Sequence, residues 1–143
     1  MLVDTNVLIY AANQDAPEHL RCRELVEQWR VGRKRWYTTW AVLYEFLRVV
    51  THPRVFPRPW EIAPALEFVE GVLASPSHRV LVETERHASI AREVMRQVPG
   101  LAGNLLHDYH TAVLMREHGV SKVCTRDSDF RRFPFVEVID PLS

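Results

Sequence analysis

The chain has 143 residues, of which 47% are hydrophobic and 25% charged, so it can bury a sizeable core and has the usual size of one domain. Its 18 basic and 18 acidic side chains give a formal net charge of zero, which excludes an overall field that attracts nucleic acid. No apolar run approaches the roughly 20 residues that cross a bilayer, so we expect no membrane span and no membrane partner.

Apolar runs of strand length alternate with longer helical patterns along most of the chain. This order predicts an α/β fold with a central, mostly parallel five-stranded sheet flanked by helices, formed by residues 1–143 as a single domain. In chain order the predicted elements are strand 2–4, helices 7–12 and 18–30, strand 36–38, helices 40–50 and 63–73, strand 79–82, helices 87–97 and 105–118, and strands 122–125 and 136–139.

Two local features refine this order. The first strand opens the chain abruptly and runs into a helix with almost no linker, which is typical of a strand in the middle of a sheet. Segment 52–59 contains three prolines. Because each proline fixes its own φ and restricts the residue before it, we expect no regular structure there.

The two cysteines, Cys22 and Cys124, lie in unrelated settings and do not form a Cys-x-x-Cys pair. The N-terminus lacks a basic region followed by an apolar run and a cleavage site. We therefore expect a cytoplasmic protein in which both thiols are small core residues.

Four acids lie at strand ends or within strongly helical segments: Asp4, Glu45, Asp108 and Asp127. Asp4 ends the first strand and Asp127 follows the fourth. Because ligands of open α/β sheets bind outside the carboxyl ends of the strands, these two positions predict a shared site. Glu45 and Asp108 can be presented to the same edge by their helices. The set indicates one metal site assembled from distant segments.

The chemistry of this set favours a hard cation. Carboxylate oxygens are the ligands that Mg²⁺ and Mn²⁺ prefer, and no cysteine or histidine pair accompanies the acids to favour zinc. Converging carboxylates repel one another, so the metal-free site should have raised pKa values and should destabilise the fold mildly. Adding metal should therefore stabilise the protein.

Each acid also has an ordinary structural interpretation. Asp4 could cap the following helix, although an unpaired carboxylate at the end of a buried strand is costly and favours a functional role. Glu45 could pair with Arg48 at i+3, and the pattern alone favours neither role. Asp108 lies in a first helical turn and Asp127 in a turn, where acids are common. Only the combination points to a metal.

Four short segments carry a family resemblance that covers essentially the whole chain. They are residues 4–10, 44–48, 103–108 and 125–130. Their order and spacing resemble the PIN-domain family, specifically the VapC-like ribonuclease toxins of type II toxin–antitoxin systems. Residues 51–56 are similar to a feature of one VapC subgroup. No acid of the pattern is missing, which indicates an active member.

This resemblance implies a single PIN-like nuclease domain over residues 1–143 and a Mg²⁺-dependent endoribonuclease that acts as the toxin of a VapBC-type pair, with Mn²⁺ able to substitute. It implies hydrolysis of RNA by metal-activated water, leaving a 5′-phosphate and a 3′-hydroxyl. Asp4, Glu45, Asp108 and Asp127 would be the catalytic and metal-binding acids, with accessory roles for Asp129, Thr5, Asn6 and Thr125.

The same resemblance implies three kinds of partner: an RNA substrate, a VapB-like antitoxin whose tail lies over the active site, and a second copy in a homodimer. Arg54 and Arg58 in the proline-rich segment could contact RNA, or the segment could simply be anchored by buried aromatic side chains. For residues 33–35 a solvated basic turn is the favoured interpretation. His107 and His110 are expected to be helix-surface or packing residues outside the site.

Two alternatives belong to other classes, and a third is a nuclease of the same family. A haloacid-dehalogenase-type phosphatase would need a second Asp two residues after Asp4, where this chain has Asn6. A receiver-like phosphoacceptor module would need a lysine at the end of a late strand, whereas Lys122 begins its strand. A DNA-directed PIN nuclease stays open, because acids that act on a phosphodiester do not report the sugar.

Overall fold

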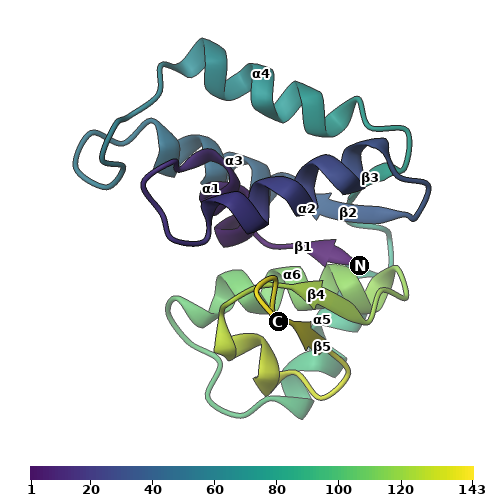
Figure 1. The fold of residues 1–143 in the computed structure, drawn as a ribbon. Coiled ribbons are helices and arrows are strands. Elements are labelled where there is room, and N and C mark those ends of the chain that lie inside the picture. Colours follow the sequence, from purple (N-terminus) through teal and green to yellow (C-terminus); the bar gives the residue numbers. More distant parts are fainter.

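All strands join one parallel sheet in the computed structural model, which describes residues 1–143 (Figure 1). The strands are β1 (Leu2–Val3), β2 (Trp36–Thr39), β3 (His78–Leu81), β4 (Lys122–Cys124) and β5 (Glu137–Ile139). Their order across the sheet is β3-β2-β1-β4-β5, and every pairing is parallel. The α/β prediction and the central position of the first strand are both confirmed.

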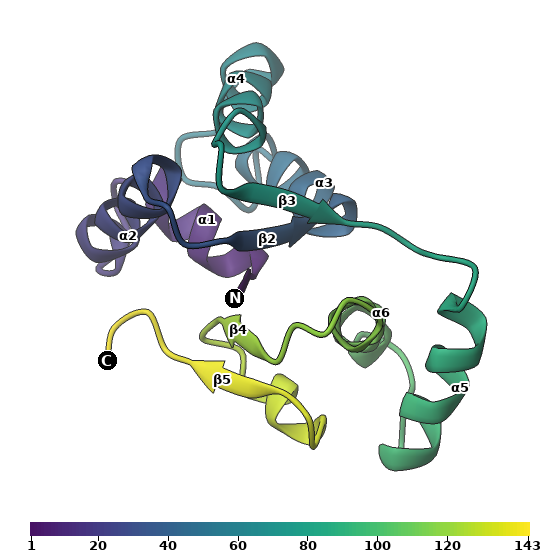
Figure 2. The same cartoon turned by 90° about the vertical axis from the view of Figure 1, so that its right-hand side faces the viewer.

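The helices form two layers around this sheet. They are α1 (Thr5–Ala12), α2 (His19–Val31), α3 (Trp40–Val50), α4 (Ile62–Leu73), α5 (His87–Gln97) and α6 (Leu105–Glu117), followed by a short 3₁₀ helix, η1 (Ser128–Arg132). Figure 2 shows α1 and α2 on one side of the sheet, and α5 and α6 on the other. Since parallel strands need crossover connections, helices on both faces are the expected outcome.

Two hydrophobic clusters hold the layers together, and successive residues of β1 divide between them. Val3 belongs to a cluster of 17 buried residues that includes Trp36 and Phe46, built with α1 to α4. Leu2 belongs to a cluster of 14 buried residues that includes Val123, built with α5 and α6. Because side chains alternate across a strand, this two-residue strand contributes one residue to each core.

The remaining differences from the sequence predictions are local. The first helix begins at Thr5, earlier than predicted, because Asp4 acts as its N-cap. The helix η1 was not predicted. No helix or strand lies between Thr51 and Glu61, as expected from the prolines, and the buried Phe56 anchors that loop.

Both cysteines are buried and free, as predicted, and burial raises the pKa of the Cys22 thiol to about 11 and that of Cys124 to about 12. Such thiols stay protonated at neutral pH and are poor nucleophiles. None of the helices combines the length and the apolar composition that a membrane crossing requires.

We predict that Phe46→Ala lowers the free energy of unfolding by about 3–5 kcal/mol, because it empties a fully buried site. The Phe46 ring stacks on Phe68 at 4.7 Å and meets Trp60 edge-on at 6.2 Å. Urea unfolding measures the loss. Leu20→Ala is the matched control, since Leu20 is 79% exposed and its truncation should change stability by less than about 0.5 kcal/mol. Equal effects of the two substitutions would contradict the described core.

Candidate metal centre

Asp4 is held at the carboxyl end of the central strand by contacts on every side. Its backbone N–H donates to the Cys124 carbonyl at 3.1 Å, which fixes it beside β4. Its carboxylate accepts hydrogen bonds from the Thr5 N–H at 2.8 Å, from Asn6 Nδ2 at 3.0 Å and from Thr125 Oγ1 at 2.7 Å. These three donors fix the orientation of the carboxylate.

Burial dominates the electrostatics of Asp4. Desolvation raises the pKa of its carboxyl, and the neighbouring Asp127 raises it further, while the hydrogen bonds from Thr125 and Thr5 lower it only in part. The pKa therefore stays above its ordinary value. A carboxylate in this position is stabilised by a nearby cation.

The strand order explains why Asp4 and Asp127 meet. From β1 the chain builds β2 and β3 toward one edge of the sheet, and it returns through α5 and α6 to place β4 on the other side of β1. Such a reversal opens a crevice at the carboxyl ends of the two central strands. Asp4 follows β1 directly, and Thr125 and Asp127 follow β4.

Thr125 connects the two strand ends. Its fully buried hydroxyl donates to Asp4 and accepts from Asn6 Nδ2 at 2.8 Å and from the Asp127 N–H at 2.9 Å. The Arg126 N–H adds a bond to Asn6 Oδ1 at 3.3 Å. The predicted accessory residues Asn6 and Thr125 thus form one hydrogen-bond network with Asp4.

Asp108 completes a group of acids with Asp127 and Asp129, whose nearest oxygens all lie within 4.8 Å of one another. Asp129 is placed by its N–H, which donates to Asp127 Oδ1 at 2.9 Å at the start of η1. Burial, followed by the charges of Asp127, Asp4 and Asp129, raises the pKa of Asp108 to about 7. These negative charges are crowded without a compensating side chain.

Glu45 lines the same cleft and belongs to α3. This helix begins immediately after β2, because the Val42 N–H donates a hydrogen bond of 3.1 Å to Oγ1 of the N-cap residue Thr39. The Arg48 guanidinium donates two hydrogen bonds of 2.6 and 2.9 Å to the Glu45 carboxylate, and these bonds hold the pKa of Glu45 below its ordinary value. The ion pair that the spacing allowed is present, and Glu45 also faces the site.

The cleft has a volume of about 680 Å³ and brings together Asp4, Glu45, Asp108 and Asp127. We call it the acid cleft. Thr5 and Asn6 also line it, whereas the fully buried Thr125 and the exposed Asp129 do not. Its other lining residues are Ile9, Ala41, Val42, Tyr44, Arg48, His107 and Thr111.

Several of these lining residues were not selected from the sequence. Ala41 lies at i−4 from Glu45 and Thr111 at i+3 from Asp108, whereas Arg48, at i+3 from Glu45, was considered only as an ion-pair partner. Helical spacing from each acid would have found them, because residues three and four apart share a helix face. His107, expected to be a surface or packing residue, is exposed on the wall of the cleft.

The donor set fits a hard divalent cation. All the candidate ligand atoms are carboxylate oxygens, and a bound cation would offset both the burial and the charge repulsion that raise the pKa of Asp108. No cysteine or histidine pair lines the cleft to favour zinc instead. The arrangement can therefore bind a metal ion and a phosphate group beside it.

Comparisons with known proteins all indicate the PIN domain family. The sequence profile of the PIN domain matches residues 1–136. Ribonuclease VapC48 of Mycobacterium tuberculosis is 34% identical over 140 residues, which cover 98% of this chain and 96% of that protein. Ribonuclease VapC37 of the same species is 36% identical over 140 residues, with the same coverage.

The fold comparison agrees. A crystal structure of VapC20 from Mycobacterium tuberculosis, a sarcin-ricin loop cleaving toxin, superimposes with a TM-score of 0.68 at 21% identity and covers 96% of this chain and 97% of that one.

The alternative of a haloacid-dehalogenase-type phosphatase loses its support. The residue two positions after Asp4 is Asn6, whose side-chain amide donates a hydrogen bond to the Asp4 carboxylate.

We predict that Asp108→Asn stabilises the metal-free protein. The fold raises the pKa of this carboxyl from 3.8 to about 7, so the folded state binds the proton more tightly than the unfolded chain. Wild-type stability should then fall as pH rises between those two values, while the variant lacks this loss. The gain above about pH 7 should be on the order of 1–2 kcal/mol, because solvent screens a partly exposed group.

Thermal unfolding in EDTA from pH 4 to pH 8 tests this prediction, with Glu67→Gln as the control. Glu67 is an exposed acid on α4 outside the ion pairs of the structure. A constant difference between Asp108→Asn and wild type at every pH would contradict the assigned shift.

Proposed function

Because the chain belongs to the PIN domain family, we propose that it is a VapC-type endoribonuclease toxin that hydrolyses RNA phosphodiester bonds with a bound divalent metal ion. One observation carries the proposal: acids from four distant segments converge in one cleft at the carboxyl ends of β1 and β4. We also propose that residues 1–143 act as a single PIN-like nuclease domain, which the one shared sheet supports.

We assign metal binding to Asp4, Asp108, Asp127 and Glu45. Mg²⁺ is the proposed ion and Mn²⁺ a substitute, since both prefer oxygen ligands in such clusters. When bound, such an ion supplies an activated water and neutralises charge on the phosphate and the leaving oxygen. The acids are the catalytic residues of this proposal.

The surrounding polar residues keep these acids in place. Thr125 and Asn6 orient Asp4 through bonds of 2.7 and 3.0 Å, and the Thr5 N–H fixes its other oxygen. Asp129 is an accessory acid beside Asp127 and Asp108. Because these contacts fix the orientation of Asp4, they favour a preorganised site.

The cleft also offers a way for a chain of zero net charge to hold RNA. Arg48 is exposed at its wall but is bound to Glu45 through two hydrogen bonds, so it becomes available to a phosphate when Glu45 turns to the metal ion. Tyr44 is 67% exposed on the same helix, and its ring is available to stack on an unpaired base. We therefore favour a single-stranded segment of RNA as the substrate.

The proline-rich loop has a smaller place in this proposal. Arg58 is committed to Asp15 through bonds of 2.9 and 3.2 Å, and the exposed Arg54 is the cation of that loop left for a phosphate. Arg33, Lys34 and Arg35 are exposed in a turn between α2 and β2, which matches the expected solvated turn.

We further propose a VapB-like antitoxin as the inhibitory partner, homodimer formation and a cytoplasmic location. The similarity to VapC ribonucleases over nearly the whole chain supports the antitoxin, and the homodimer follows from the family resemblance alone. The two free, buried thiols fit a reducing compartment.

We predict that Asp4→Asn lowers metal-dependent RNA cleavage at least 100-fold, roughly the loss expected when several kcal/mol of charge stabilisation disappear. The assay follows a mixed RNA pool in Mg²⁺, in Mn²⁺ and in EDTA, with single-stranded DNA in parallel. Glu67→Gln should cleave like wild type. Unchanged cleavage by a folded Asp4→Asn protein would refute the site, and cleavage of DNA alone would reassign the substrate.

We predict that Mg²⁺ stabilises the wild-type protein by about 2.7 kcal/mol at 100 times its Kd, because the ion binds the folded state only. Asp4→Asn should remove most of this gain. Thermal unfolding with and without Mg²⁺ measures it in the absence of RNA, so metal binding is tested separately from cleavage. A stabilisation that is equal in both proteins would place the ion elsewhere.

A further inference from the structure

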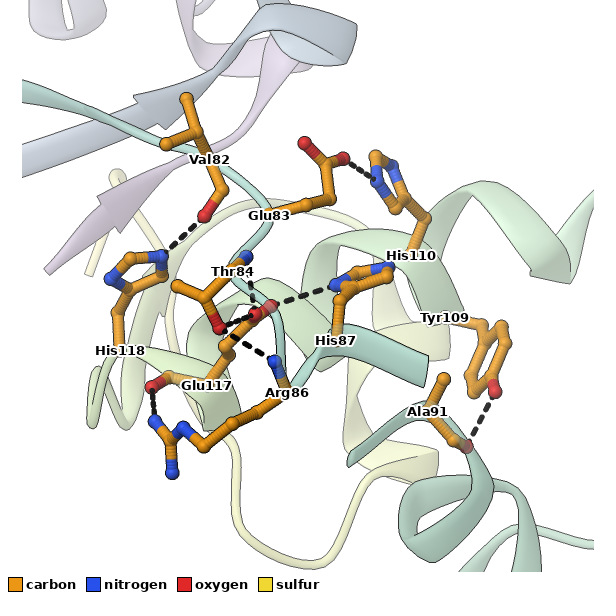
Figure 3. A network of polar contacts seen from close by, with 10 residues as sticks. All are labelled: Val82, Glu83, Thr84, Arg86, His87, Ala91, Tyr109, His110, Glu117 and His118. Atoms are coloured by element: carbon orange, nitrogen blue, oxygen red, sulfur yellow. Dashed lines mark hydrogen bonds and ion pairs between the residues drawn. The ribbon is translucent and has the colours of Figure 1, made fainter. Parts of the chain in front are cut away.

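A second group of metal-ligating side chains lies outside the acid cleft. Glu83 follows β3, His87 is the first residue of α5, and His110 projects from the middle of α6. One ligand atom from each lies within 4.8 Å of the other two, and none of the three lines the acid cleft. Figure 3 shows the rings of His87 and His110 side by side with Glu83 facing His110. We call this group the histidine cluster.

The distances between the ligand atoms of the histidine cluster suit a single metal ion after a small movement of Glu83. His110 Nε2 already lies 2.7 Å from Glu83 Oε1, and the two imidazole rings are 5.8 Å apart at 77°. A tetrahedral ion with bonds of about 2.1 Å separates its ligands by about 3.4 Å. The carboxylate of Glu83 is exposed on a loop, so it can move by the small distance that this geometry requires.

Glu117 supplies the support that metal-bound histidines need. Its side chain is fully buried, and Oε2 lies 2.7 Å from His87 Nδ1. The other oxygen of this carboxylate, Glu117 Oε1, accepts hydrogen bonds from the Thr84 N–H at 2.7 Å and from the Thr84 hydroxyl. A hydrogen bond from Nδ1 to a carboxylate leaves Nε2 with a free lone pair, which is the arrangement of carboxylate–histidine–metal groups.

Charge and access also favour a cation. Although burial raises it, the pKa of Glu117 is held below its ordinary value by the hydrogen bonds from Thr84 and His87, so this carboxylate stays negative. Glu83 adds a second negative charge. The His87 and His110 side chains are 25% and 36% exposed, which leaves the ligand atoms open to solvent on one side.

We propose that the histidine cluster is a binding site for a divalent transition-metal ion of the Zn²⁺ type. His87 Nε2, His110 Nε2 and the Glu83 carboxylate would be the protein ligands, with water at the open position and Glu117 orienting His87. Two imidazoles and one carboxylate select such ions over Mg²⁺. The bound ion would link the segment between β3 and the start of α5, which carries Glu83 and His87, to His110 on α6. This inference is independent of the proposed nuclease function.

The test titrates the Asp4→Asn protein with Co²⁺ in excess Mg²⁺, so that the acid cleft is disabled. We expect the visible absorption of four-coordinate Co²⁺ to saturate at one equivalent per chain, and Zn²⁺ to abolish it by displacement. Zn²⁺ should also raise the unfolding temperature. No saturable absorption together with no Zn²⁺-dependent stabilisation would overturn the proposal.

Added substitutions identify the ligands. His110→Asn, at a partly exposed position, should abolish the Co²⁺ absorption while the protein stays folded, and Glu117→Gln should weaken binding about 10–100-fold. His52→Gln is the matched control, because His52 lies in the proline-rich loop, and it should leave binding unchanged. Binding that survives His110→Asn would also overturn the proposal.

Discussion

The parallel pairing of β1 with β4 is the constraint on which the rest of the site depends. It joins residues more than a hundred positions apart through the bond from the Asp4 N–H to the Cys124 carbonyl. With that register fixed, Thr125 reaches Asp4, and the turn after β4 brings Asp127 to the same edge. A slip of one residue would turn each side chain to the other face of the sheet. The short first strand can hold its place because both of its residues are buried, one in each core.

The fold holds negative charges together at a cost that its own hydrogen bonds reduce only in part. Thr5, Asn6 and Thr125 donate to Asp4, yet the pKa values of Asp4 and Asp108 stay raised. Such a site lowers the stability of the fold but holds carboxylates in an orientation that suits a cation. Arg48 forms an ion pair with Glu45, whereas no such pair compensates Asp4 or Asp108.

Helix α6 links the two polar regions of the molecule. It presents Asp108 to the acid cleft and His110 to the histidine cluster, and its final residue, Glu117, is buried behind His87. Since successive helical residues point in different directions, one rigid element can serve both sites without mixing their ligands. The acid cleft gathers carboxylate oxygens without a histidine pair, whereas the histidine cluster combines two imidazoles with the carboxylate of Glu83, so the two regions differ in the metals that they favour.

The alternation of apolar segments determined the α/β class, and the abrupt first strand its central place, since both depend on local periodicity and chain connectivity. The sequence also marked Asp4 and Asp127 as strand-end acids. Only the tertiary structure decided that Glu45 both pairs with Arg48 and faces the cleft, and that His110 meets Glu83 and lies beside His87. These contacts join separate elements, whose relative positions follow from core packing and strand order; local residue spacing does not encode them.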